Sequence, residues 1–445
     1  MHVGSNLSSS IHYNQNQIKK VSIGNTPIYS TDSASDNSNS KKVIYGYHID
    51  SSEYDSDKAV TYLADAIGMT PAKMGDSEFD YGSWKNAFFM PKPCMLKYDG
   101  TVDYYLNPND YSKKLDGTAS DVSNIDYPGN AMVEFPLIYY KISGDNSGTA
   151  DIYISNYKVD DDYKCWANIN AKNEIIPHFY MGIYTGFKDK NGRLRSLVIP
   201  ESHYLNFIFF MKNSIEMAEL NNIDNNNLWN IDLYCDHIII NLLLTLISKS
   251  LDAVSKFGFG NKFFSSTDLT IKLGRLNDKG LFYGDTTQKH KLVIPKKVFG
   301  MEWGGESRHI NGYYSIVTSQ GTTSYCEEKY KLTYGTADGS SIDNYNLTGE
   351  GYIKAERLLD EYFCNIGGYK YNNDGSFYPC RKTYGSTDPY KGDFHKSDSG
   401  NGIYPLCINT NTIWDWDLDS KTRIRDQQVA NECKTYTTLS CKPNL

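Results

Sequence analysis

The stretch that decides the fold reads Lys92-Pro-Cys-Met-Leu-Lys-Tyr-Asp-Gly-Thr-Val-Asp-Tyr-Tyr-Leu-Asn-Pro-Asn-Asp-Tyr111. Asp99-Gly100 separates two runs of strand-forming residues, and this pair is typical of a two-residue type I′ turn, in which both residues have positive φ angles. Asn107-Pro108 follows the second run, and the residue before a proline favours extended or turn geometry. The sequence therefore predicts a β-hairpin that turns at Asp99-Gly100 and ends at Asn107.

Strand signals continue on both sides of this hairpin, over residues 43–157. Within that range, residues 132–142 lead through a turn rich in Ser, Gly, Asp and Asn into an alternating apolar segment at 150–154, which predicts a second hairpin. Pro136 should confine its strand to an edge or a bulge, because proline cannot donate a ladder hydrogen bond. A further strand is predicted at 178–184.

The pattern changes to helix in the centre of the chain. Residues 204–220 and 233–254 carry recurring apolar residues without turn residues, over lengths that favour helix. Gly258 and Gly260 are predicted to end the second helix. After Lys262 the chain is rich in glycine and in short strand signals. The predicted fold class is therefore α+β, β-rich and loop-rich, with two central helices.

The length of the chain, 445 residues, exceeds the usual size of one hydrophobic core, so more than one domain is expected. Residues 1–42 are predicted to be a small β attachment segment. It ends in a linker of Ser, Asp and Asn, which cannot bury enough apolar surface to order itself. A β-rich hairpin subdomain is predicted at 43–157, and a larger domain that holds both helices at 158–445.

Composition argues against several classes of partner. The chain carries 45 basic and 53 acidic residues, a net charge of −8, which disfavours a broad interaction with nucleic acid. The longest apolar run, 238–247, is half of the ~20 residues that a membrane span needs, so no membrane insertion is predicted. Nine cysteines without a C-x-x-C pair suggest neither a zinc ribbon nor a disulfide framework. The 37 tyrosines are typical of recognition surfaces, although AT-rich codon usage produces the same enrichment.

Several collinear segments resemble tail-fibre or tail-tip adhesion proteins of bacteriophages and phage-derived particles. They lie at residues 45–50, 92–111, 129–136, 194–197, 239–250, 279–284 and 298–305. The later segments resemble a C-type-lectin-like fold of the formylglycine-generating-enzyme type, and the resemblance implies that fold for this chain. Its structural landmarks are Asp99, Gly100, Trp303, Gly304 and Arg308. Trp303-Gly304 follows Glu302 directly, two residues earlier than is usual in the family.

The resemblance also implies a variable ligand-binding face near the C-terminus, flanked by strands at 401–410 and 436–443. The candidate ligand-binding residues there are Tyr404, Trp414, Asp415, Trp416, Asp417 and Asp419. On a strand, Trp414 and Trp416 would point the same way, and aromatic faces stack on sugar rings while carboxylates bind hydroxyls. This arrangement is compatible with a carbohydrate receptor, and packing of both tryptophans in the interior is the competing interpretation.

The same acidic spacing could also gather oxygen ligands for calcium. As an EF-hand it is incomplete, because Ser420 stands where the glycine should be and Asp426 stands where the bidentate Glu should be. No cofactor or metal site is therefore predicted, and calcium is kept as the alternative.

Motifs for the common enzyme classes are absent, so the chain is predicted not to be an enzyme. We expect a virion protein of the tail or baseplate that is synthesised in the cytoplasm of the bacterial host. Residues 1–42 would dock onto other tail or baseplate proteins, and the rest would recognise a bacterial surface receptor. The family implies a homotrimer. Two alternatives remain: a structural baseplate or head-decoration protein, and a tail-associated polysaccharide-degrading enzyme with two carboxylates about 5 to 9 Å apart.

Overall fold

The computed structural model describes residues 41–198, 217–223, 228–250, 256–258, 273–284, 296–303 and 439–444, with gaps at 51–52, 54, 56, 145–148 and 173. Elsewhere it describes only the backbone of individual strands. The chain divides into two units, Met1–Lys42 and Val43–Leu445. The first unit contains two antiparallel strand pairs, which are β1 (Ile11–Tyr13) with β2 (Asn16–Ile18) and β3 (Lys20–Ile23) with β4 (Thr26–Ser30). Most of the predicted linker lies outside the described residues.

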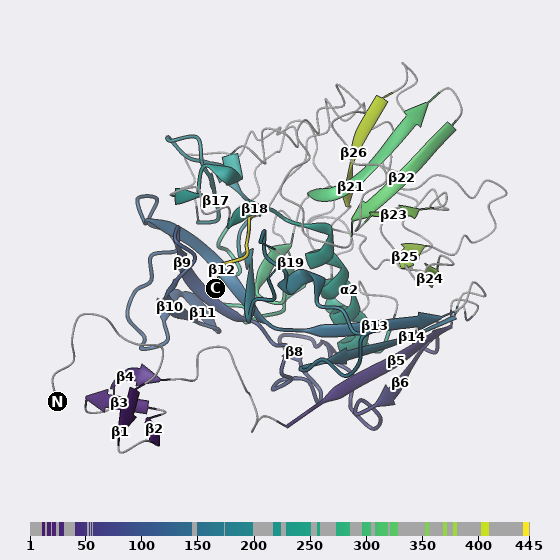
Figure 1. Ribbon diagram of the computed structural model, residues 1–445, viewed down its shortest axis with the longest axis horizontal. Coiled ribbons are helices and arrows are strands. Elements are labelled where there is room, and N and C mark those ends of the chain that lie inside the picture. The colour runs from purple at the N-terminus through teal and green to yellow at the C-terminus, as the bar shows by residue number, and fades with distance from the viewer. Residues whose placement is uncertain are drawn as a thin grey trace. The chain divides into compact units, whose positions relative to one another are not determined.

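Two antiparallel sheets frame the second unit (Figure 1). The spatial order of the seven-stranded sheet is β11 (Asp110–Lys114), β10 (Val102–Asn107), β9 (Lys92–Lys97), β12 (Gly129–Pro136), β15 (His178–Gly182), β27 (Leu439–Cys441) and β18 (Trp229–Ile231). The order of the four-stranded sheet is β13 (Tyr139–Gly144), β14 (Thr149–Ser155), β5 (Ile44–Asp50) and β6 (Val60–Ala64). The predicted β-rich character is thus confirmed, and the larger sheet takes strands from both sides of residue 157.

Shorter elements complete the described fold. The two-stranded pairs are β7 (Lys73–Met74) with β8 (Phe79–Asp80), β16 (Phe187–Lys188) with β17 (Leu194–Arg195), β19 (Lys296–Val298) with β20 (Met301–Trp303), and β24 (Gly368–Tyr371) with β25 (Phe377–Cys380). Another sheet has the order β23 (Tyr352–Ala355), β22 (Gly321–Glu327), β21 (Arg308–Thr318) and β26 (Gly402–Ile408). The helical elements described with both ends are the 3₁₀ helix η1 (Trp166–Asn168) and α2 (Tyr234–Ser248), and residues 217–219 and 256–257 are also helical.

The hairpin of β9 and β10 is present, but its turn differs from the prediction. Lys97 and Thr101 close a three-residue loop, since the Lys97 amide donates to the Thr101 carbonyl oxygen at 2.9 Å. Of the two expected residues only Gly100 has a positive φ, 82°, as in a type I turn followed by a bulge. The Asp99 carboxylate accepts bonds from the Thr101 amide at 2.9 Å and hydroxyl at 2.6 Å. These bonds lower the pKa of Asp99 and fix the loop.

The second predicted hairpin is also present, as β13 and β14. The expected strand at 132–142 is nevertheless split between two sheets, because β12 ends at Pro136 and β13 begins at Tyr139. The expectation that Pro136 marks an edge or a bulge is wrong, since β12 is an inner strand between β9 and β15. Pro136 is its last residue and lies beyond the end of β9, so the missing N–H interrupts no pairing on that side.

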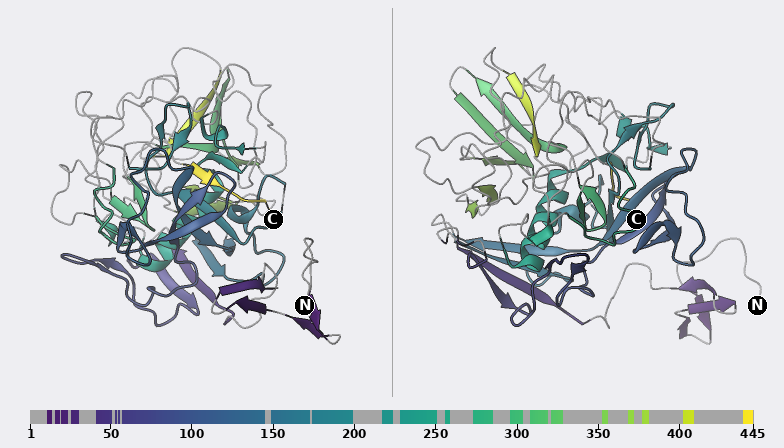
Figure 2. Two further views of the ribbon diagram at one scale, coloured as in Figure 1. Left: turned by 90° about the vertical axis from the view of Figure 1, so that its left-hand side faces the viewer. Right: turned by 180° about the vertical axis from the view of Figure 1, so that it is seen from behind.

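The strand β27 comes from the far end of the sequence and lies inside the larger sheet, between β15 and β18 (Figure 2). An ion pair next to this strand ties it to α2. The Lys442 ammonium lies 2.7 Å from an oxygen of Asp236, in the first turn of α2, and both side chains are buried. The Ser440 hydroxyl donates to the other oxygen of Asp236 at 3.1 Å. Burial lowers the pKa of Lys442, but the charges of Asp236 and Cys235 and the hydrogen bonds that they accept from the ammonium together outweigh it, so the pKa is raised.

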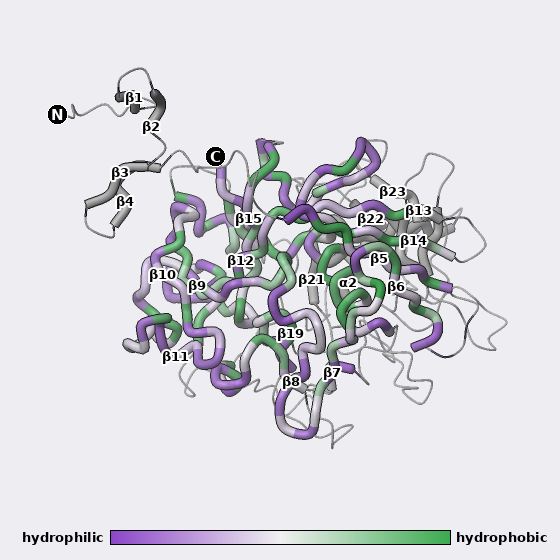
Figure 3. Tube along the Cα trace, turned by 90° about the horizontal axis from the view of Figure 1, so that it is seen from below, coloured by the Kyte–Doolittle hydropathy of each residue, from purple (hydrophilic) through white to green (hydrophobic). Residues whose placement is uncertain are grey.

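The helix α2 lies within the predicted range 233–254 but ends earlier than expected. Lys249 adopts the left-handed conformation, with φ 52°, and its amide donates to the Thr245 carbonyl oxygen at 2.9 Å, which closes the helix at Ser248. The predicted end at Gly258 and Gly260 is therefore wrong. Figure 3 shows that α2 is hydrophobic along most of its length. Of the other predicted helix, 204–220, residues 217–219 are helical and 204–216 lie outside the described residues.

A pair of tyrosines fixes α2 to the four-stranded sheet. Tyr47 of β5 and Tyr62 of β6 are direct cross-strand partners. Their hydroxyls donate to the carbonyl oxygens of Leu242 at 3.1 Å and Leu246 at 2.8 Å. Residues four apart in a helix lie one above the other on the same face. The spacing of the two cross-strand tyrosines therefore matches one turn of the helix. The two phenols fix the position of α2 along the sheet and its rotation about its own axis.

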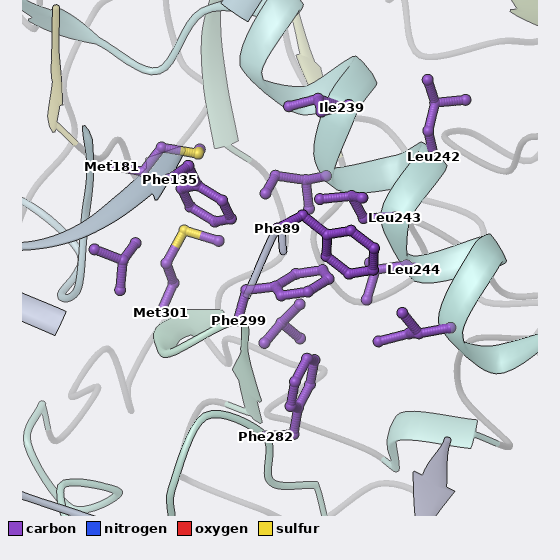
Figure 4. Close-up of a cluster of buried hydrophobic side chains, with 14 of the residues drawn as sticks. Phe89, Phe135, Met181, Ile239, Leu242, Leu243, Leu244, Phe282, Phe299 and Met301 are labelled. Atoms are coloured by element: carbon purple, nitrogen blue, oxygen red, sulfur yellow. The ribbon is translucent and has the colours of Figure 1, made fainter. Parts of the chain in front are cut away.

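Aromatic and aliphatic side chains from α2 and the strands around it form the main core (Figure 4). Phe299 occupies its centre, with its ring 4.9 Å from that of Phe282 and 6.1 Å from that of Phe135. Phe299 and Gly300 form the two-residue turn between β19 and β20, and both have positive φ angles, 47° and 83°. A bulky residue in this conformation is strained by about 1–2 kcal/mol. Burial of the Phe299 ring offsets that strain.

We expect Tyr47→Phe and Tyr62→Phe each to lower the free energy of unfolding by about 1 kcal/mol, because each change removes one buried hydrogen bond and keeps the ring. Urea denaturation followed by circular dichroism measures the change. Tyr153→Phe on β14 is the matched control, since the Tyr153 hydroxyl makes no hydrogen bond in the described part of the structure. If all three variants behave alike, the two phenols do not anchor α2.

Candidate functional site

The residues predicted for the variable face fall mostly outside the described part of the chain. Those outside it are Trp414, Asp415, Trp416, Asp417 and Asp419, together with the landmark Gly304. The backbone of Tyr404 lies in β26 and pairs with Ser315 of β21. The proposed sugar-binding face and the alternative calcium site therefore stay predictions.

The other landmarks lie on the scaffold. Trp303 is the last residue of β20 and pairs with Lys296, and Arg308 is the first residue of β21 and pairs with Ile408. Gly100 approaches the C-terminal segment, because a Cβ added there would lie 3.0 Å from Leu228 and 3.4 Å from Pro443. The landmark turn at Asp99-Gly100 thus packs a hairpin against a segment from the far end of the chain.

The landmark segment at 194–197 holds neighbouring strands together through Arg195. This buried guanidinium donates to the carbonyl oxygens of Tyr127 and Gly129, both at 2.7 Å, and lies 3.1 Å from an oxygen of Asp189. A buried arginine is stable when its donors are paired in this way. We therefore assign Arg195 to structure and not to ligand binding.

A buried pair of opposite charge accompanies the landmark at 298–305. Lys297 of β19 and Glu302 of β20 are cross-strand partners. The Lys297 ammonium donates to the Leu276 carbonyl oxygen at 2.8 Å and lies 3.5 Å from the centre of the Tyr111 ring. Glu302 accepts a bond from the Gly274 amide at 2.9 Å. Burial lowers the pKa of Lys297 to about 7 and raises the pKa of Glu302 to about 7.

The polar group best placed to meet a ligand, among the described residues, is a cluster around Glu134 on one face of the larger sheet. Glu134 lies on β12, with Lys92 of β9 as its partner on one side and Tyr180 of β15 on the other. Tyr105 of β10 and His178 of β15 complete the cluster. We call these five residues the Glu134 cluster.

The carboxylate of Glu134 is nearly buried, 4% exposed, and accepts hydrogen bonds from two phenols. Its oxygens lie 3.1 Å from the Tyr105 hydroxyl and 3.0 Å from the Tyr180 hydroxyl. The Nε2 atom of His178 lies 3.8 Å from Glu134, and the Lys92 ammonium lies 5.7 Å from the centre of the Tyr105 ring. Lys92 is exposed, while Tyr105 and His178 are half-buried. The cluster therefore has a buried base and an accessible rim.

The electrostatics of the cluster suit binding better than proton transfer. Burial, and then the charge of Glu134, raise the pKa of both Tyr105 and Tyr180. Both phenols consequently stay neutral and donate to the carboxylate at physiological pH. Their oxygens retain lone pairs, and Lys92 and His178 supply donors at the rim.

Sequence reasoning missed this site because its five residues come from four separate strands. The one available signal was Glu134 itself, a charged residue within the otherwise apolar run 131–135. A charge in such a run is buried only when partners satisfy it. Their identity depends on strand order, which the sequence did not reveal.

Other features of the described residues bear on the predicted chemistry. No group of three or more His, Cys, Asp or Glu side chains among them is arranged to hold a metal ion. No helix among them is long and apolar enough to cross a membrane. The free cysteines in this part of the chain are all buried, namely Cys94, Cys165, Cys235 and Cys441.

The variant Lys297→Met removes the cation opposite Glu302, and its effect should depend on pH. A buried lysine whose pKa is lowered to about 7 is charged only below that pH, and there it destabilises the folded state most. We expect the variant to be more stable than wild type at about pH 5, where the buried Lys297 cation is gone and Glu302 is neutral, and to lose most of this advantage at about pH 9, where Lys297 of the wild type is itself neutral. Urea denaturation at both pH values tests this, with the exposed Lys73→Met as control. An equal difference from wild type at both values would contradict it.

No family model, no curated protein and no solved structure matches this chain. The assignment of function therefore rests on the residues and the geometry described above.

Proposed function

We propose that this chain is a phage tail-fibre or tail-tip adhesin, in which residues 1–42 attach to the tail or baseplate and the larger unit recognises a receptor on the bacterial surface. The proposal starts from the collinear sequence resemblance at residues 45–305. It includes a C-type-lectin-like fold for the larger unit, assembly as a homotrimer and location in the virion.

The observation that supports the proposal most is the position of the candidate recognition residues in the sequence relative to the described strands. The stretch that contains Trp414 and Trp416 lies between β26 and β27 in the sequence. β27 is an inner strand of the larger sheet and has buried residues such as Leu439. A variable binding segment that joins two strands can be positioned by the scaffold and can change in sequence without loss of the fold. A receptor-binding protein needs this combination.

The separate N-terminal unit supports the same assignment. Met1–Lys42 is a compact unit of its own, built from short strand pairs. An adhesin has two interaction tasks, attachment to the particle and recognition of the cell, and a two-unit chain separates them. The structural-protein alternative differs in one respect, because it would bury the Trp414 region between subunits.

Binding of the full-length chain to intact cells tests the proposal. We expect fluorescently labelled protein to bind some strains of a bacterial panel in flow cytometry, and Trp416→Ala to lower that binding at least about tenfold, since anchor aromatics dominate recognition surfaces. Ile67→Ala, which removes a side chain that is 70% exposed, is the control for nonspecific adhesion. Absence of the protein from purified particles, or cell binding that Trp416→Ala leaves intact, would overturn the assignment.

A further inference from the structure

We propose that the Glu134 cluster is a binding site for a neutral saccharide, distinct from the face predicted around Trp414. The inference deepens the proposed function, on which its biological meaning rests, by naming a ligand class and a second site. The residues that would contact the sugar are Lys92, Tyr105, Glu134 and His178, and Tyr180 would hold the carboxylate in place.

The cluster lies where the apolar cover of one face of the larger sheet becomes incomplete. Cys94, Met132 and Glu134 lie on the same face, because Cys94 and Met132 are cross-strand partners and alternate residues share a face. Around Cys94 and Met132 this face is covered by apolar side chains. The covering residues are Leu194, Met217, Ala218 and Leu228. At Glu134 this cover becomes incomplete, because Tyr180 is buried whereas Lys92 is exposed and Tyr105 and His178 are half-buried.

A carboxylate at position 134 is unfavourable compared with an apolar side chain. An apolar residue at 134 would continue the surface formed by Leu96 and Met132, which are both buried. A buried carboxylate is instead unfavourable unless hydrogen bonds satisfy it. Two phenols supply those bonds, and such a satisfied network is rigid. The hydrogen-bonding groups are therefore already oriented before a ligand arrives, which lowers the entropic penalty of binding.

The hydrogen-bonding groups and the charge of the cluster match those of a neutral sugar. Saccharide hydroxyls donate and accept, and the cluster offers acceptors in the oxygens of Glu134 and Tyr105 and donors in Lys92 and His178. The half-buried Tyr105 ring offers an apolar face for the C–H groups of a pyranose ring. The negative charge of Glu134 and the positive charge of Lys92 cancel. A neutral polyhydroxyl ligand therefore fits better than an anion or a cation.

Saturation-transfer NMR on the full-length protein tests the site, with D-glucose, D-galactose and N-acetyl-D-glucosamine as neutral probes and D-glucuronate as the anionic comparison. We expect at least one neutral probe to bind and glucuronate to bind more weakly. Tyr105→Phe, which removes only the hydroxyl, and Lys92→Met should each weaken that binding about tenfold. Tyr104→Phe, at the adjacent position of the same strand, is the matched control and should leave the dissociation constant unchanged.

Two results would overturn the inference. One is that no neutral probe binds. The other is that Tyr105→Phe and Lys92→Met leave binding unchanged while circular dichroism shows that both are folded. These results are separable from the fate of the proposed function, because cell binding that depends on Trp416 would stand without any sugar at Glu134. Sugar binding at Glu134 would likewise stand if the chain proved not to be an adhesin.

Discussion

The ion pair between Lys442 and Asp236 is the contact on which the larger unit depends most. It joins the strand β27, an inner strand of the seven-stranded sheet, to the first turn of the only long helix in the described residues. Both charges are buried, so neither could remain there alone without a penalty of several kcal/mol. The sheet and the helix therefore stabilise each other through this pair. The pair also keeps a segment from the far end of the chain in register with strands from its beginning.

Local features of the fold were predictable from the sequence, whereas its long-range contacts were not. The strands around residues 92–107 and 139–155 and the helix after Leu233 follow from residue preference and periodicity. The turn at Asp99-Gly100 was predicted with the wrong geometry, because the Asp-Gly signal fits two loop lengths and the bonds from Thr101 selected the longer one. The prediction that Pro136 lies at a sheet edge or a bulge was also wrong. A proline at the last position of an inner strand leaves no local pattern in the sequence that would reveal its place.

The two candidate sites differ in the same way, because one was predicted from the sequence and the other depends on long-range contacts. The residues around Trp414 were chosen for their chemistry, and the described part of the chain does not reach them. The Glu134 cluster could not be predicted from the sequence. Tyr105 lies on β10, two strands from Glu134 on β12, and this strand order is set by the tertiary structure. The tyrosines show how composition can mislead. Tyr47, Tyr62 and Tyr180 are buried donors that join elements of the scaffold, so part of the enrichment serves the interior of the protein.

The position of β27 also sets an order of events during synthesis. The edges of β15 and β18 emerge from the ribosome long before residues 439–441 exist to fill the space between them. Until then both edges offer unpaired backbone groups, which are prone to pair with other chains. Completion of the larger sheet must therefore wait until translation has passed the candidate recognition region, and a chain that stops earlier leaves the sheet open. The architecture thus lets the sheet close only in chains that have already made the segment proposed to bind the receptor.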